Sequence, residues 1–392
     1  MKQYQTLIKF LIDKYDRLKS LSKDRTGVGT VKTFGWMMRF NLEQGFPLVT
    51  VKKTFFNSII RELLWFLMGS TDNKKLQEMG CHIWDPWAVT EKDLVEYYST
   101  RYNDPRLQQI LSSSDEYSVV LDGLIDAGIA PADCRKHIDQ LGPIYSDTWT
   151  NWQDIRIIPV DSEIPYGFED MGFDDRAVGD TEARVIGRSI NQIQNVIDML
   201  KTNPHSRRII VSAWDPRHLP DESISPQANV IEGRAALAYC HAFFQFATEE
   251  MSFLERAKHY MGNVELATDT VIDENYLDEV DYPKYRLNCM LMQRSTDSAL
   301  GLPFNIASYS LLTMMIAQCV NMVPGDFVWT GGDVHLYANQ VEPMRATLEL
   351  QPFESPTVKL NPAVKDIFAF KEEDITLLNY KYHPPIKMDA AV

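Results

Sequence analysis

The 392-residue sequence has few cysteines, no long apolar run and no excess of positive charge, and each absence excludes a class of protein. Its five cysteines are odd in number and widely spaced, without a Cys-x-x-Cys word, so neither a disulfide framework nor a zinc ribbon is indicated. No stretch approaches the roughly 18 apolar residues of a membrane-spanning helix. The net charge of −15 argues against broad binding to nucleic acid or anionic membranes, so any anionic ligand must meet a local cluster of basic side chains.

The first residues, MKQYQTLIKFLIDKY, have the pattern of an amphipathic helix and lack the apolar core and cleavage site of a signal peptide. We therefore expect a cytoplasmic protein. With 45% hydrophobic and 24% charged residues, the composition is typical of a globular protein.

Dense apolar blocks alternate with looser acidic segments along the chain. Residues 161–175 contain six acids and no base, and residues 269–281 contain another six. Such stretches are typical of surface insertions. We therefore expect a single domain, residues 1–392, with insertions at about the following positions: 89–140, 155–185, 216–236 and 252–284.

Apolar periodicity predicts several elements of secondary structure. Residues 57–69 are apolar nearly all round and predict a buried helix that ends at Gly69, in which Glu62 would be buried. Ser189 is expected to cap a second helix, which ends before Asn203. The apolar face of this second helix would consist of Ile190, Ile193, Val196, Ile197 and Leu200.

Short β-branched or aromatic runs at 208–214, 241–247 and 287–295 predict buried strands, and residues 308–320 return to helical spacing. The mixture of helices and strands predicts an α+β fold around a central sheet.

Cys240 lies where an irregular stretch meets the predicted strand 241–247. A single cysteine is more often a small buried side chain than a nucleophile. Arginines close to a thiol would lower its pKa and favour the attacking thiolate. Three short polar segments supply such residues, namely Arg25, Arg207, Arg208, Arg294 and Ser295. Each arginine alone is more often part of a surface ion pair, but four together suit a phosphate dianion, because guanidinium groups bind phosphate oxygens bidentately.

Asn305 carries an amide that can accept from N3–H and donate to O4 of a uracil ring, whereas an Asp there would suit cytosine. Alone, Asn305 could equally cap a loop. His335 alone is more often a core histidine, and without a second His or Cys at a fixed offset no metal site is indicated.

Seven blocks of the sequence resemble thymidylate synthases and their phage hydroxymethylase relatives. They are MRFNLEQGFPLVT (38–50), ELLWFLMGST (62–71), SRRIIVSAW (206–214), CHAFFQF (240–246), QRSTDSALGLPFNIASY (293–309), GDFVWTGGDVHLYANQ (325–340) and IKMDAAV (386–392). The blocks occur in the family's order and together contain 79 of the 392 residues, about a fifth of the chain. The resemblance implies a thymidylate synthase-like fold, in which helices cover a central mixed sheet and one sheet face packs in a homodimer.

The resemblance also implies a reaction and its residues. Cys240 would add to C6 of dUMP, with 5,10-methylenetetrahydrofolate as co-substrate and no metal. Glu62, through ordered water, and Tyr145 would manage proton transfer at O4 and C5, and His241 and Trp84 would complete the catalytic group. The implied nucleotide ligands are Arg25, Arg294 and Ser295 at the phosphate, Arg207 and Arg208 donated to that phosphate by the other subunit, Asn305 at the uracil, and His335 and Tyr337 at the deoxyribose. The implied folate positions are Lys52, Ile83, Trp84, Trp87, Asp297, Gly301 and Phe304.

The sequence departs from the family pattern at two places. The family usually has PCH at the nucleophile and YGxQW at the tyrosine loop, whereas this chain has Tyr239-Cys240-His241 and YSDTW at 145–149. The hydroxyls of Tyr239, Ser146 and Thr148 could retain a water near the reacting carbon. We therefore expect water addition, giving 5-hydroxymethyl-dUMP and tetrahydrofolate, as in bacteriophage deoxyuridylate hydroxymethylases.

Two alternatives stay open. The synthase-like terminus 386–392 and the retained Trp84 favour thymidylate synthase itself, which methylates dUMP reductively to dTMP and releases dihydrofolate. A non-catalytic nucleotide-binding regulator on the same scaffold is the more remote alternative. Such a protein would be marked by the loss of Cys240 or Glu62, and this chain retains both.

Overall fold

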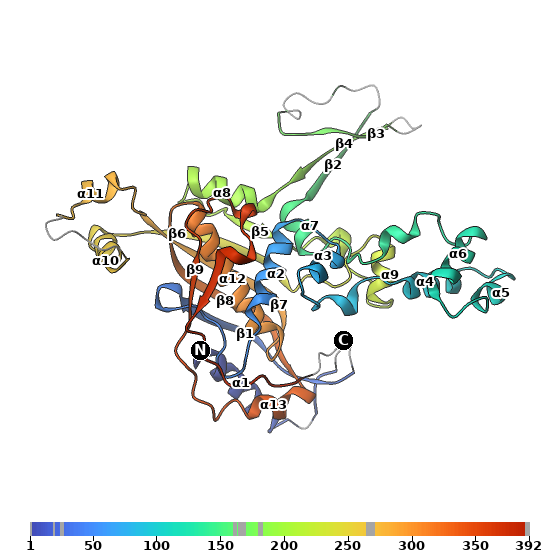
Figure 1. Ribbon diagram of the computed structural model, residues 1–392, viewed down its shortest axis with the longest axis horizontal. Helices are drawn as coiled ribbons and strands as arrows, with labels where there is room; N and C mark the ends of the chain where they lie inside the picture. The colour runs from blue at the N-terminus through green and yellow to red at the C-terminus, as the bar shows by residue number, and fades with distance from the viewer. Residues whose placement is uncertain are drawn as a thin grey trace. The chain divides into compact units, whose positions relative to one another are not determined.

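The computed structural model describes residues 2–18, 20–23, 27–159, 163, 170–178, 183–263 and 271–388. The chain divides into two compact units (Figure 1). Unit 1 consists of Met1–Leu64, Ile193–Ser212 and Cys240–Val392, and unit 2 consists of Trp65–Gln192 and Ala213–Tyr239. The single domain expected from the sequence stays a prediction. Among the described residues, no helix combines the length and apolar character needed to span a membrane.

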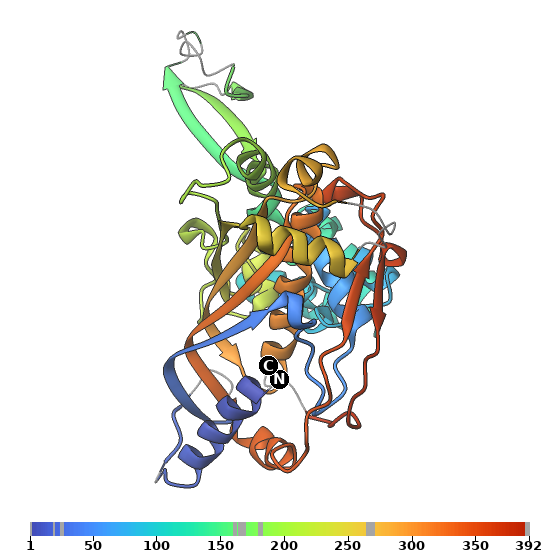
Figure 2. The same cartoon turned by 90° about the vertical axis from the view of Figure 1, so that its left-hand side faces the viewer.

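A five-stranded mixed sheet is the centre of unit 1. Its strand order is β1 (Thr30–Asn41), β8 (Val323–Tyr337), β7 (Tyr285–Asp297), β6 (His241–Glu250) and β5 (Ile210–Ser212). Strands β7 and β8 are parallel, and all other neighbours are antiparallel. The sequence prediction of a central mixed sheet is therefore confirmed. Figure 2 shows the long strands curving as they run side by side.

The parallel pair β7 and β8 is joined by the buried helix α12 (Gly301–Cys319), which packs against both strands. A parallel pair needs such a crossover, because its two strands run in the same direction. On β1 lies the amphipathic helix α1 (Lys2–Tyr15), which also contacts α13 (Val341–Arg345). Strand β7 ends at Asp297 and α12 begins at Gly301, and several of the predicted site residues lie in this part of the chain.

The remaining elements of unit 1 lie around this sheet. They are α2 (Phe56–Leu67), which continues into unit 2, α8 (Gln192–Thr202), which begins at the last residue of a unit 2 segment, α10 (Phe253–Asn263), α11 (Glu274–Glu279), the antiparallel pair β9 (Thr357–Leu360) and β10 (Ile375–Leu378), and short 3-10 helices at Leu42–Gln44, Ala338–Gln340, Ile367–Ala369 and Glu372–Asp374.

Unit 2 consists of helices and one small sheet. The helices are α3 (Asn73–Glu78), α4 (Glu91–Arg101), α5 (Leu107–Leu111), α6 (Tyr117–Asp126), α7 (Tyr145–Thr150) and α9 (Pro226–Ile231), with 3-10 helices at Asp85–Trp87, Cys134–His137 and Pro216–His218. The sheet is antiparallel, in the order β2 (Trp152–Pro159), β4 (Ala183–Ile190) and β3 (Asp174–Val178). Among the described residues, the insertions expected at about 89–140, 155–185 and 216–236 thus contain helices and strands of their own.

Two helix predictions have different outcomes. The predicted helix 57–69 is confirmed as α2, Glu62 in it is buried, and Gly69 adopts the positive φ of 68° that suits a residue just past a helix end. The Ser189 cap is wrong, because Ser189 pairs with Gln153 in the sheet of unit 2 and the helix begins only at Gln192. The expected apolar face is nevertheless buried from Ile193 onward.

The predicted strands and the last helix also shift in their bounds. Of residues 208–214 only Ile210–Ser212 forms a strand, whereas the strands at 241–247 and 287–295 are longer than expected. The helix predicted at 308–320 begins earlier, at Gly301, because Pro303 is tolerated in a first helical turn. Asn305 therefore lies on a helix and caps no loop.

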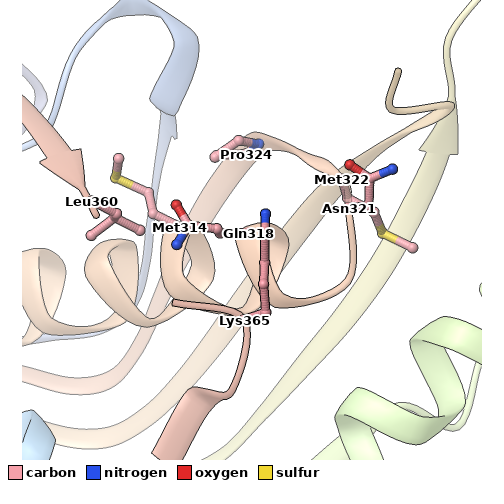
Figure 3. Close-up of a pocket in the computed structure, with 7 residues that line it drawn as sticks. All are labelled: Met314, Gln318, Asn321, Met322, Pro324, Leu360 and Lys365. Carbon is pink, nitrogen blue, oxygen red and sulfur yellow. The ribbon is translucent and has the colours of Figure 1, made fainter. Parts of the chain in front are cut away.

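A cavity of about 280 Å³ lies at the C-terminal end of α12 (Figure 3). It is lined by Met314, Gln318, Asn321, Met322, Pro324, Leu360 and Lys365. None of these residues was predicted to bind substrate or folate.

Candidate active site

The proposed nucleophile, Cys240, directly precedes β6, beside the end of β7. The Arg294 backbone N–H donates to the Cys240 carbonyl over 2.8 Å, and the Arg294 guanidinium nitrogen Nη2 lies 3.9 Å from the Cys240 Sγ. Gly332 on β8 permits this arrangement, because a Cβ there would lie 2.7 Å from the Arg294 carbonyl oxygen. The strands therefore place one cation next to the thiol.

Burial raises the pKa of the Cys240 thiol, and the positive charge of Arg294 offsets only part of this effect. Arg294 therefore lowers the Cys240 pKa as expected, but burial outweighs this effect, so that the net shift is upward. Desolvation disfavours the thiolate more than one guanidinium at 3.9 Å favours it.

Asn305, the proposed uracil reader, is the last of three buried, hydrogen-bonded side chains in unit 1. We call these residues, Trp329, Gln293 and Asn305, the relay. The indole N–H of Trp329 donates to Gln293 Oε1 over 2.8 Å, and Gln293 Nε2 donates to Asn305 Oδ1 over 2.8 Å. An indole nitrogen only donates, so the direction of both hydrogen bonds is fixed. Trp329 and Gln293 could not be identified from the sequence, because their roles depend on partners far apart in the chain.

His241 is buried and forms a hydrogen bond with Asn305, a member of the same relay. Its Nδ1 lies 3.1 Å from the Tyr309 hydroxyl. Burial lowers the pKa of His241 to about 4, although a hydrogen bond with Asn305 opposes this shift. His241 is therefore a neutral imidazole near pH 7, and its contacts point to holding Asn305 in place.

His335 and Tyr337 lie at the end of β8, with their rings 5.2 Å apart. His335 Nδ1 lies 3.0 Å from Asp333 Oδ1, and Lys32 Nζ donates to Asp333 Oδ2 over 2.8 Å. Although burial alone would raise the pKa of Asp333, hydrogen bonds from Lys32 and His335 hold it below its usual value. The ionised Asp333 orients the imidazole through Nδ1, so Nε2 is the nitrogen suited to a ligand.

The predicted phosphate ligands are only partly brought together. Ser295 follows Arg294 on β7 and pairs with Asp333 on β8. Arg207 and Arg208 lie just before β5, are exposed, and form no ion pair within the described parts of the chain. Arg25 lies outside the described residues.

The folate positions predicted in unit 1 cluster at the start of α12. Asp297 Oδ1 accepts from the backbone N–H groups of Ala299 and Leu300, and its Oδ2 accepts from Gln340 Nε2 over 2.8 Å. Lys52 Nζ donates to the Ala299 carbonyl over 2.6 Å, and burial lowers the pKa of Lys52 to about 8. A carboxylate has about four acceptor sites, so Asp297 retains room for a further donor.

Gly301 and Phe304 lie in the first turn of the same helix. Both are partly exposed. A Cβ at Gly301 would lie 3.7 Å from Asn305 Oδ1, so the glycine leaves open the space beside the proposed uracil reader.

In unit 2 the predicted residues form an aromatic cluster. Trp84 lies 5.7 Å from Trp87 and 6.4 Å from Tyr145, measured between ring centroids. Ile83 and Trp87 are partly exposed, whereas Trp84 and Tyr145 are buried. The remaining rings of the cluster are Trp65, Phe66, Trp149 and Tyr239.

Two of the three hydroxyls expected to hold water already donate to backbone carbonyls. Tyr239 Oη donates to the Pro143 carbonyl over 2.5 Å, and Thr148 Oγ1 donates to the Tyr145 carbonyl over 3.1 Å. Ser146 Oγ, in contrast, is buried and has no hydrogen-bond partner among the described residues.

Comparison with known proteins bears on the whole chain. The sequence model of the family described as thymidylate synthase matches residues 2–392. A protein of Francisella philomiragia subsp. philomiragia named thymidylate synthase is 36% identical over 392 residues, covering 100% of both chains. A protein of the same name from Francisella tularensis subsp. holarctica is 35% identical over the same length, again with 100% of both chains covered.

The names of these relatives agree with the reductive alternative better than with the expected hydroxymethylation, and the phage resemblance is not confirmed. A non-catalytic regulator gains no support from them. Because the match extends over the full length of the chain, the protein belongs to the thymidylate synthase family of one-carbon transferases.

Proposed function

We propose that the protein is a thymidylate synthase that converts dUMP to dTMP. The observation that carries this proposal comes from unit 1, where the Cys240 thiol lies 3.9 Å from the Arg294 guanidinium and Asn305 presents an amide of fixed direction. A thiol suits addition to a pyrimidine C6, and a guanidinium suits the phosphate of a nucleotide.

Each side chain of this group has a defined task. Cys240 attacks C6 as the thiolate, and the positive charge of Arg294 favours that form. Asn305 uses one acceptor lone pair of Oδ1 for Gln293 and keeps the other for uracil N3–H, while its amide group donates to O4. His335 donates or accepts through Nε2 at the deoxyribose hydroxyl.

The residues fit a folate as co-substrate. 5,10-Methylenetetrahydrofolate, when bound, supplies both the one-carbon group and the hydride. The Asp297 carboxylate and the buried Lys52 offer polar contacts for its pterin, and Trp84 and Trp87 offer aromatic surface. Glu62, buried on α2, is proposed to manage the proton at O4.

Ser146 favours a second candidate, deoxyuridylate hydroxymethylase. A buried hydroxyl needs a partner, and an ordered water supplies one readily. Ser146 follows Tyr145, the residue that the family resemblance puts beside C5 of dUMP. In this second candidate, a water held by Ser146 is the nucleophile for hydroxymethylation.

A single reaction separates the two candidates. The protein is incubated with dUMP and methylenetetrahydrofolate, the nucleotide product is identified by mass spectrometry, and dihydrofolate is followed by absorbance. dTMP with one equivalent of dihydrofolate is the expected result. Hydroxymethyl-dUMP without dihydrofolate would overturn the proposal in favour of the second candidate, and a Ser146→Gly variant would then be the first to test. Cys240→Ser is the control, which should bind dUMP without turnover.

We further propose a homodimer formed by the uncovered face of the five-stranded sheet. Ile210 and Met37 on its edge strands are exposed apolar side chains, and Phe243, Met290 and Met292 on its inner strands are partly exposed. An apolar sheet face of this kind is typical of an obligate interface. The exposed Arg207 and Arg208 lie next to β5 and are proposed to reach the phosphate of the partner.

A further inference from the structure

Tyr239, which directly precedes Cys240, stands where the family usually has proline. Its side chain is buried and belongs to unit 2, where it contacts the segment leading into α7. Its hydroxyl donates to the Pro143 carbonyl over 2.5 Å, and its ring meets the Tyr145 ring edge to face at 6.0 Å and 72°. A proline at this position could make neither contact.

The same two chain segments are joined at two further points. The Ala236 backbone N–H donates to the Leu141 carbonyl over 2.9 Å. Gly142 has a φ of 68°, and a Cβ there would lie 2.1 Å from the Arg234 carbonyl oxygen, so only glycine permits this close approach. These contacts fix the start of the segment 141–145, and Tyr239 fixes its end.

The hydroxyl of Tyr239 is a dependable donor. Burial, together with the carboxylates of Asp215 and Asp147, raises the pKa of Tyr239 well above its ordinary value. The phenol therefore keeps its proton throughout the working pH range, and the hydrogen bond to Pro143 persists.

We propose that Tyr239 is a positioning residue that holds Tyr145 in place, by a hydroxyl tether to Pro143 and by contact between the two rings. This inference rests on the proposed function and on the role beside the C5 proton of dUMP that the family resemblance implies for Tyr145. It assigns to the residue before the nucleophile a task in C5 proton removal, a step separate from thiol attack.

The test compares Tyr239→Phe with Tyr98→Phe, which removes the hydroxyl of another buried tyrosine of unit 2, on α4. Loss of the tether should lower kcat roughly 10-fold, within the range that a misplacement of about 1 Å causes, and leave KM for dUMP within about 2-fold. With dUMP deuterated at C5, the isotope effect on kcat should rise in Tyr239→Phe and stay unchanged in Tyr98→Phe.

A second substrate separates this inference from the proposed function. 5-Fluoro-dUMP carries a fluorine at C5 that cannot leave as a cation, so the covalent complex of Cys240, nucleotide and methylenetetrahydrofolate should accumulate. Wild type and Tyr239→Phe should form it to the same extent, as measured by intact-protein mass spectrometry. If the wild-type protein forms none, the proposed function fails.

Three results would overturn the inference while the function stands. They are an unchanged kcat and isotope effect in Tyr239→Phe, a loss of the fluorinated complex together with turnover, or the same isotope effect in Tyr98→Phe. If Tyr239→Phe does not fold, Tyr239→Met decides, because a flexible methionine can fill the buried space while it removes both the hydroxyl tether and the ring contact. It should give the same isotope signature, and a wild-type signature would refute the inference.

Discussion

Replacing Trp329 by phenylalanine tests the relay that gives Asn305 its direction. The indole N–H is the donor that fixes Gln293 Oε1, and Gln293 in turn donates to Asn305 Oδ1. All three side chains are buried, with Trp329 fully so. The substitution retains an aromatic ring and removes the indole N–H together with part of the indole. The hydrogen bond that is lost is therefore the one to the Gln293 amide.

The size of the effect follows from the cost of an unpaired buried acceptor, about 1–3 kcal/mol. Without the indole donor nothing fixes the orientation of the Gln293 and Asn305 amides, and rotation of both amides exchanges donor and acceptor toward the base. A rotated Asn305 donates toward N3 and accepts from the exocyclic group, which is the pattern of cytosine. Because either response removes the match to uracil, dUMP affinity should fall by roughly 10- to 100-fold, and the preference for dUMP over dCMP should narrow.

Isothermal titration calorimetry with dUMP and dCMP measures both effects. The control is Trp36→Phe on β1, a tryptophan whose ring contacts Phe10. Unchanged dUMP affinity and selectivity in Trp329→Phe, with normal folding, would show that the relay does not set the direction of Asn305.

Four further predictions concern the same unit. The rate at which iodoacetamide alkylates Cys240, measured by mass spectrometry as a function of pH, should have its midpoint above the value of about 8.5 for a free thiol, because burial raises the Cys240 pKa. Arg294→Gln should move this midpoint higher. A midpoint below about 8.5 would contradict the prediction. The free energy of unfolding should decrease by about 2 kcal/mol between pH 7 and pH 5. The reason is that His241 takes up a proton below about pH 6.5 in the unfolded state, whereas its pKa in the folded state is about 4. Urea unfolding of His241→Asn should lack this decrease, and an equal decrease would refute the assignment. Asn305→Asp should shift the preference toward dCMP, and retained dUMP selectivity would mean that the base is read elsewhere. Phe243→Asp should convert the dimer to monomer in analytical ultracentrifugation, unless the sheet face lies outside the interface.

Local sequence patterns were sufficient for features that depend on neighbouring residues. The burial of Glu62 follows from the apolar residues around it on α2, and the buried face of α8 follows from its period. The Ser189 cap failed because strand pairing with Gln153 outweighed a local capping preference.

Features that depend on distant strands could not be predicted from local patterns. The parallel pairing of β7 with β8 needs Gly332 opposite Arg294, and nothing near Gly332 in the sequence indicates this. The Trp329 and Gln293 relay is likewise formed only when these strands meet α12. For Cys240 the sequence identified the cation but underestimated desolvation, which depends on the surrounding packing.

The segment 251–284 also has a consequence for protein engineering. It leaves the sheet after Glu250 and returns at Tyr285, which are paired, and the Met251 backbone N–H donates to the Lys284 carbonyl over 2.9 Å. Its helices α10 and α11 share a small core of their own around Ala257, Tyr260 and Leu277. The point of departure and the point of return are therefore adjacent, as at the base of a hairpin. A two-residue Asn-Gly turn could close the strands there without changing their register, and a foreign domain with neighbouring termini could be grafted at the same base.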